Sequence, residues 1–281
     1  MTSLRPARRF DWNNLRQRAM SATVLAPLAI LAVWFGGWLL LIVLAAAAAL
    51  LAVEWSVMSA PHAPTRMSVV ITVTLLLALF TAELKGYAPA WVFLALAPLV
   101  CALVARGVAE RPTDAAFGAV YIGLPCLALS WIRNSDVPGH PYAGRDWTIL
   151  LLAVTWAADI GAFAVGNLLK GPKLWPRFSP NKTWSGFGGG LAAAIAASVT
   201  VGLITHMMLS VAAAALMGLI GGLATMGGDL LESMLKRRFG VKDSGDLIPG
   251  HGGLLDRVDG LLFAILAVAL ARLIHLEGWR T

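Results

Sequence analysis

The stretch that decides the fold runs from Ser21 to Val53 and reads SATVLAPLAILAVWFGGWLLLIVLAAAAALLAV. It contains no Asp, Glu, Lys or Arg, and it is longer than the roughly 20 residues that a helix needs to cross a bilayer. Gly36 and Gly37 lie within it, and glycine gives the backbone the freedom that a tight turn requires. We therefore expect two membrane spans joined by a sharp turn.

The rest of the chain continues the same pattern. Of its 281 residues, 58% are hydrophobic and 13% are charged, whereas about a quarter of the residues are charged in soluble domains. Apolar segments can be drawn at 20–35, 38–57, 67–83, 88–106, 114–132, 147–169, 187–207, 209–231 and 256–275. The sequence predicts an all-α, polytopic helical membrane bundle of about nine transmembrane helices. We divide it into N-terminal spans (1–145) and a catalytic region with two polar loops (146–281).

The basic residues predict the orientation of this bundle, because Lys and Arg concentrate in cytoplasmic connections. With the N-terminus in the cytoplasm, the inner segments hold seventeen of the 22 basic residues. These are Arg5, Arg8, Arg9, Arg16, Arg18, Arg66, Arg106, Arg111, Lys170, Lys173, Arg177, Lys182, Lys236, Arg237, Arg238, Lys242 and Arg257. We expect a protein of the inner (cytoplasmic) membrane with its polar loops in the cytoplasm. This topology accounts for the net charge of +7, so no nucleic-acid partner is needed.

Acidic residues gather beside the two polar loops, which run over 170–185 and 236–255. Asp229 and Glu232 end one span and Asp256 and Asp259 begin the next, and each pair is three residues apart and so shares a helix face. Acids at membrane depth are costly and usually functional. If the two spans pack together, the carboxylates meet and form the oxygen donors that Mg²⁺ prefers beside substrate phosphates.

Basic residues are interleaved with these acids, and Lys and Arg are good donors to phosphate oxygens. They are Lys182, Lys236, Arg237, Lys242 and Arg257. Metal ions that bridge phosphates, together with cations that take up developing charge, are what phosphoryl or nucleotidyl transfer needs. The residues alone thus predict metal-assisted phosphoryl chemistry, without naming its substrates.

The sequence disfavours three other classes of membrane protein. A CDP-alcohol phosphotransferase is disfavoured because no Asp follows Asp259. A transporter or ion channel is disfavoured because the acids lie at one end of their spans and no internal repeat is evident. A membrane scaffold leaves the two dense polar loops unexplained. The two cysteines, Cys101 and Cys126, have no spacing that suggests a metal site or a disulfide.

The stretch 233–259, SMLKRRFGVKDSGDLIPGHGGLLDRVD, carries a specific resemblance. It is similar to the signature of the phosphatidate cytidylyltransferase (CDP-diacylglycerol synthase) family: Ser, two residues, Lys-Arg, four residues, Lys-Asp, and a final Pro-x-His-Gly-Gly-x-x-Asp-Arg-x-Asp. Two further blocks of that family are present, Ser-Pro-Asn-Lys-Thr-Trp-Ser-Gly at 179–186 and Asp-Ile-Gly-Ala-Phe at 159–163. The resemblance covers about residues 155–260.

The resemblance implies CMP transfer from CTP to phosphatidate at the cytoplasmic face of the lipid bilayer, yielding CDP-diacylglycerol and pyrophosphate. It implies Mg²⁺ as cofactor, with a second or monovalent cation left open, and it is compatible with a homodimer. The implied metal ligands are Asp229, Asp256 and Asp259. The implied catalytic residues are these three with Lys182, Lys236, Arg237, Lys242 and Arg257. The implied substrate-binding residues are Ser179, Asn181, Lys182, Thr183, Lys236, Arg237, Lys242, His251, Gly252, Gly253 and Arg257.

Two positions depart from the family pattern. Many members carry Glu where this chain has Ser185, and Tyr where it has Phe163. If that Glu contacts metal or substrate in its bearers, another group must do so here. Asp159 and Asp243 are left with open roles, the first as a partner of Lys182 and the second as a loop cap.

Overall fold

The computed structural model describes residues 23, 27–176, 179–207, 209–245 and 252–278. Its helices are α2 (Gly37–Ser59), α3 (Pro64–Lys85), α4 (Tyr87–Gly107), α5 (Pro112–Arg133), α6 (Ala143–Leu169), α7 (Trp184–Ile204), α8 (Val211–Arg238) and α9 (Leu255–Gly278). Within the described part of the chain, eight helices are long and apolar enough to cross a membrane. Residues 27–35, the described part of the first predicted span, are also helical. The prediction of a polytopic helical membrane protein is confirmed.

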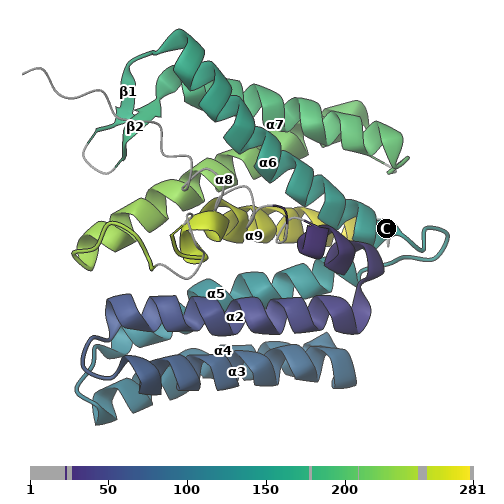
Figure 1. Cartoon of the computed structure of the whole chain (residues 1–281). Helices are drawn as coiled ribbons and strands as arrows, with labels where there is room; N and C mark the ends of the chain where they lie inside the picture. Colours follow the sequence, from purple (N-terminus) through teal and green to yellow (C-terminus); the bar gives the residue numbers. More distant parts are fainter. Residues whose placement is uncertain (1–22, 24–26, 177–178, 208, 246–251, 279–281) are drawn as a thin grey trace, which may run out of the picture.

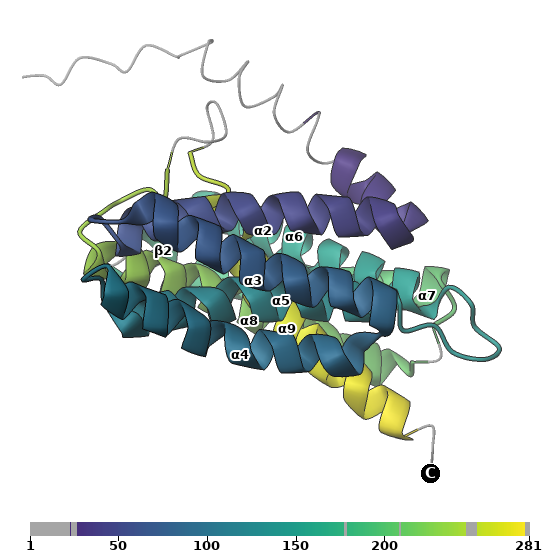
Figure 2. The same cartoon turned by 90° about the horizontal axis from the view of Figure 1, so that it is seen from below.

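The helices form three groups (Figure 1). Helices α2 to α5 pack together, and α5 also contacts α9. Helices α8 and α9 pack against each other in the middle, and α6 and α7 form a close pair on the far side. Figure 2 shows α3 and α4 on the face that lies away from α6 and α7. The signature helices α8 and α9 are therefore enclosed between the N-terminal helices and the α6–α7 pair.

The sharp turn expected at Gly36 and Gly37 is present. Both residues have positive φ angles, 65° and 50°, which other residues rarely adopt. The turn is held from α5, where Arg133 donates hydrogen bonds to the carbonyl oxygens of Val33 (2.5 Å) and Trp34 (3.1 Å). A basic residue at the end of one span thus satisfies backbone acceptors at the turn before α2.

The prediction that the second polar loop begins at residue 236 was wrong, because α8 continues to Arg238. Two contacts of its last turn explain the extension. Lys236 lies 2.7 Å from the Glu232 carboxylate one turn earlier, and such pairs stabilise helices. Arg238 donates a hydrogen bond of 2.6 Å to Asp114 at the start of α5. Cations also interact favourably with the C-terminal end of a helix dipole.

The first polar loop contains a small antiparallel hairpin, which hydropathy did not predict. Strands β1 (Lys173–Trp175) and β2 (Ser179–Thr183) pair with Lys173 opposite Thr183 and Trp175 opposite Ser179. The hairpin lies at the end of the α6–α7 pair (Figure 1). It holds the Ser-Pro-Asn-Lys-Thr block in a defined position beside the helices.

Candidate active site

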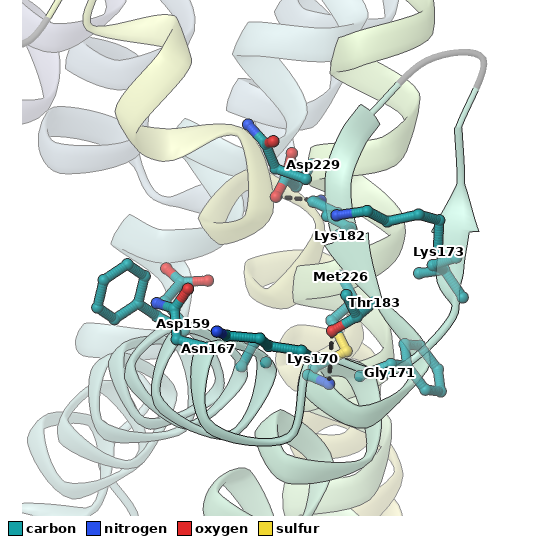
Figure 3. Close-up of a pocket in the computed structure, with 16 residues that line it drawn as sticks. Asp159, Asn167, Lys170, Gly171, Lys173, Lys182, Thr183, Met226 and Asp229 are labelled. Atoms are coloured by element: carbon teal, nitrogen blue, oxygen red, sulfur yellow. Dashed lines mark hydrogen bonds and ion pairs between the residues drawn. The ribbon is translucent and has the colours of Figure 1, made fainter. Parts of the chain in front are cut away.

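Helices α6 and α7 approach each other through glycines. A Cβ on Gly161 would lie 2.8 Å from the carbonyl oxygen of Gly189, and one on Gly186 would lie 2.8 Å from that of Ala162. Such contacts leave no room for a side chain, and in lipid small residues let helices pack this closely. Asp159, two residues before Gly161, lines a cavity to which Gly186 and Phe187 of α7 also contribute (Figure 3).

Two hydroxyl groups tie the hairpin to α7. Thr183 caps the helix, since its Oγ1 accepts a hydrogen bond of 3.1 Å from the backbone N–H of Gly186. The Ser185 hydroxyl accepts one of 3.1 Å from the N–H of Gly171 and lies 3.1 Å from Thr183 Oγ1. Lys182 directly precedes the capping residue, so these bonds determine where its backbone lies.

A cavity of about 790 Å³ opens between α6, the hairpin and α8 (Figure 3). Its polar lining consists of Asp159, Asn167, Lys170, Lys173, Asn181, Lys182, Thr183 and Asp229. Its larger apolar side chains are Phe163, Leu174, Phe187 and Met226. The Lys182 ammonium forms an ion pair with the Asp229 carboxylate, which connects the hairpin with α8. Three lysines beside apolar side chains suit a ligand that has both phosphate groups and an apolar portion.

The crossing of α8 and α9 brings two predicted metal ligands together. A Cβ on Gly228 would lie 2.6 Å from the carbonyl oxygen of Asp259, and one on Gly260 would lie 2.8 Å from that of Thr225. The helices therefore touch at these glycines. Asp229 follows Gly228 and Asp259 precedes Gly260, so each of the two acids is next in sequence to a glycine of this contact.

A second polar cluster lies at the end of α8. The Lys236 ammonium is 2.7 Å from Glu232 Oε2 and 2.5 Å from Asp256 Oδ1. Asp256 Oδ2 accepts hydrogen bonds from the backbone N–H groups of Ser244 (3.0 Å) and Gly253 (3.1 Å). Both charges of the buried pair Glu232 and Asp256 thus face one cation. Lys236 holds α8, α9 and the intervening loop together, and its role as a phosphate contact stays a prediction.

The other predicted cations are exposed. Arg237, Lys242 and Arg257 all have exposed positions at the end where α8 stops and α9 starts. Within the described residues, Arg237 and Lys242 form no ion pair. Their charges are therefore available to a ligand that carries phosphates.

The carboxylates of Asp229 and Asp259 could contribute to a Mg²⁺ site. Mg²⁺ is commonly held by one or two carboxylates together with waters and substrate oxygens, so these two residues are compatible with it, and their role as ligands stays a prediction. Within the described residues, no group of three His, Cys, Asp or Glu side chains is arranged to hold a metal. Asp256 differs from the other two, since both of its oxygens already accept protein donors. Its role as a ligand stays a prediction.

Four residues of this region were not singled out in the sequence. Asn167, Lys170 and Lys173 line the cavity, and the two lysines could have been found because they belong to the same polar loop as Lys182. Glu54, on α2, accepts hydrogen bonds from the backbone at the start of α9. The only signal for Glu54 was a single acid near the end of an otherwise apolar span.

Comparison with known proteins identifies the family of the chain. The model of the cytidylyltransferase family matches residues 16–275. The chain belongs to the cytidylyltransferase family. Phosphatidate cytidylyltransferase of Brucella melitensis is 36% identical over 269 residues, which cover 95% of this chain and 94% of that protein. The Bacillus subtilis enzyme of the same name is 40% identical over 52% of this chain and 53% of its own length. The resemblance inferred from the signature is confirmed.

The structure divides most of the predicted site residues of this chain between the cavity and the cluster at the start of α9. Asn181, Lys182, Thr183 and Asp229 line the cavity, and Asp259 lies where α9 contacts Gly228 of α8. Lys236, Gly253 and Asp256 belong to the cluster at the start of α9. Ser179 begins β2 outside the cavity lining, and Gly252 adopts a φ of +83° just before the cluster. His251 lies outside the described residues.

Proposed function

We propose that this chain transfers the cytidylyl group of CTP to phosphatidate, which yields CDP-diacylglycerol and pyrophosphate. The reaction follows from the family and from relatives that bear the name phosphatidate cytidylyltransferase. The observation that carries the proposal is the ion pair of Lys182 with Asp229 inside a cavity that is both cationic and apolar. It joins the hairpin block and the signature helices in one site.

The chemistry requires no protein nucleophile. A phosphate monoester is mostly doubly ionised at neutral pH, since its second pKa is about 6. An oxygen of the phosphatidate phosphate attacks the α-phosphorus of CTP, and the bond from that phosphorus to the bridging oxygen of pyrophosphate breaks. Both partners are anionic, so the protein must align them and offset their charge.

The lysines of the cavity are the groups that offset this charge. Lys170, Lys173 and Lys182 reach the cavity from the end of α6 and from the two strands. Phe163 and Phe187 offer apolar surface to the acyl portion of the lipid. A divalent cation held by Asp229 and Asp259 would neutralise further phosphate charge. A second or monovalent cation stays a prediction.

The location of the reaction follows from the charge pattern. CTP is a cytoplasmic nucleotide. The end of α6, the hairpin and the end of α8 are rich in basic residues, and the preference of Lys and Arg for cytoplasmic connections assigns these segments to the cytoplasm. We therefore place the site at the cytoplasmic face of the inner membrane. A homodimer stays a prediction, which cross-linking of the protein in native membranes would test.

The direct test uses the purified full chain in liposomes with phosphatidate and CTP labelled at the α-phosphorus. We expect the label to enter a lipid product only when CTP, phosphatidate and Mg²⁺ are all present, with one pyrophosphate released per labelled lipid. CTP labelled at the γ-phosphorus should leave the lipid unlabelled. Labelling of the lipid from γ-labelled CTP, or the absence of any CTP-dependent product, would overturn the proposal.

A further inference from the structure

The N-terminal helices contribute one carboxylate to the region of the signature. Glu54 lies on α2, is 3% exposed, and is separated by about two hundred residues from the segment it contacts. Its Oε1 accepts a hydrogen bond of 2.7 Å from the N–H of Leu254, and its Oε2 accepts one of 2.7 Å from that of Leu255. Both oxygens are therefore engaged by the backbone at the start of α9.

These bonds explain why an acid is tolerated at this depth. A buried carboxylate is costly unless it is paired or hydrogen-bonded. No described Lys, Arg or His forms an ion pair with Glu54. The first N–H groups of a helix lack partners within the helix, and the helix dipole favours a negative charge at that end. The start of α9 supplies both donors and a favourable field.

Gly253, a glycine of the signature, lies so close to Glu54 that a side chain would not fit there. A Cβ on Gly253 would lie 2.9 Å from each carboxylate oxygen of Glu54 and 1.9 Å from the hydroxyl oxygen of Ser244. Ser244 donates toward both Asp256 Oδ2 (3.0 Å) and Glu54 Oε2 (3.3 Å). Only glycine fits at residue 253 while the loop, Glu54 and Asp256 keep these positions.

Glu54 is itself held firmly. The next residue, Trp55, is 1% exposed, and its indole N–H donates a hydrogen bond of 3.0 Å to the carbonyl oxygen of Asp114 on α5. The indole packs over Gly118, where a Cβ would lie 2.1 Å from its nitrogen. Helix α2 is thus locked to α5 beside Glu54, so the carboxylate is a fixed point.

We propose that Glu54 is a positioning residue that fixes the start of α9 and thereby the orientation of Asp256 and Asp259. Asp256 holds Lys236, and the backbone of Asp259 contacts Gly228 of α8, so a shift at the start of α9 changes both the ion pair and the helix crossing. Misplacing reacting groups by about 1 Å can lower a rate by roughly 100-fold. The effect on turnover rests on the proposed cytidylyl transfer, whereas the effect on α9 does not.

The test compares Glu54→Gln with a matched control, Glu110→Gln. Glutamine keeps the size of the side chain but turns one acceptor into a donor, which cannot accept the N–H of Leu254 or Leu255. Glu110 is also buried, at 8% exposure, and its Oε1 accepts both of its backbone hydrogen bonds, from His62 (2.6 Å) and Ala63 (2.9 Å), so Glu110→Gln removes a buried charge but can keep these bonds. It differs from Glu54 in that these bonds reach the connection between α2 and α3 instead of the start of α9.

Both variants are measured as full chains in nanodiscs for thermal unfolding, kcat and KM, and for hydrogen exchange of the peptide that spans residues 252–258. We expect Glu54→Gln to lower kcat at least about tenfold with a smaller change in KM for CTP, and to speed exchange at 254 and 255. Glu110→Gln should leave kcat and the exchange at 254 and 255 unchanged, even if it lowers the unfolding temperature as much as Glu54→Gln does.

Two results would overturn the positioning role. One is an unchanged kcat and unchanged exchange in Glu54→Gln. The other is a decrease of kcat in both variants that is proportional to the decrease of the unfolding temperature. Glu54 would then only stabilise the fold. If the wild-type chain shows no CTP-dependent product, the proposed function fails, and the exchange at 254 and 255 alone decides whether Glu54 fixes α9.

Discussion

At the scale of single residues, Lys182 shows how the position of one charge follows from local structure. It directly precedes the Thr183 cap, and its ammonium faces Asp229 across the cavity. We expect Lys182→Met to lower kcat/KM by roughly 10- to 100-fold, since a hydrogen bond to a charged group contributes about 1.5–3 kcal/mol. The assay is CTP-dependent lipid labelling in liposomes.

The control for Lys182→Met is Lys85→Met, which removes an exposed lysine at the end of α3. It should keep full activity. Adding Asp229→Asn to Lys182→Met should cost less than the two single changes combined, because the pair is already broken. Independent, additive effects of the two changes would show that this ion pair has no part in the reaction.

Lys170, unlike Lys182, has a backbone conformation that is unfavourable in free energy for a residue other than glycine. It ends α6 in the left-handed region, with φ 45° and ψ 44°, a position that glycine usually takes at helix ends. Its side chain lines the cavity. Strain of this kind persists where the side chain is needed.

We expect Lys170→Gly to raise the free energy of unfolding by about 1 kcal/mol, because the left-handed conformation costs a non-glycine residue roughly that much. The same change should lower activity, since the cavity loses a cation. Thermal unfolding in detergent and the lipid-labelling assay measure the two effects separately. A variant that becomes more stable at undiminished activity would exclude Lys170 from phosphate binding.

At the scale of elements, the crossing of α8 and α9 decides whether two acids meet. Gly228 faces the backbone of α9, where a Cβ would lie 2.6 Å from the carbonyl oxygen of Asp259 and 3.1 Å from Gly260 Cα. Backbone cannot move aside as a side chain can. We expect Gly228→Ala to force the helices apart, with a destabilisation of about 1–3 kcal/mol and a loss of activity.

The neighbouring Gly227 offers a matched control, because a Cβ there would meet nothing within 4 Å. Gly227→Ala should stabilise α8 by up to about 1 kcal/mol through helix propensity and keep its activity. Thermal unfolding and turnover of the two variants test the crossing directly. Equal behaviour of the two alanine variants would contradict the assigned role of Gly228.

The same elements show what could be read from the sequence. The spans follow from runs of apolar residues. The three-residue spacings of Asp229 with Glu232 and of Asp256 with Asp259 predict that the carboxylates of two spans meet if these spans pack together. Hydropathy could not show that α8 continues to Arg238, because that extension depends on contacts with Glu232 and Asp114. It also could not show the β1–β2 hairpin, whose position depends on hydroxyl groups at the start of α7.

At the scale of the whole molecule, the chain is less divided than its sequence suggests. The separation into 1–145 and 146–281 stays a prediction, but α2 reaches the signature through Glu54 and α5 reaches it through Asp114. Both contacts join residues far apart in the chain, and local sequence patterns such as hydropathy do not predict contacts of this kind. The site was therefore predictable where its residues share a motif and unpredictable where a distant helix supports it.

The orientation of the molecule in the membrane is the remaining prediction at this scale. The hairpin carries Trp175, and the connection between α5 and α6 carries Pro138, both of them exposed. The native cysteines Cys101 and Cys126 are buried, so they should react little with a charged reagent. In intact spheroplasts, we expect a membrane-impermeant maleimide to label Pro138→Cys and to spare Trp175→Cys until the membrane is broken. The reverse pattern would place the cavity outside the cytoplasm, where CTP does not reach it, and would contradict both the orientation and the proposed reaction.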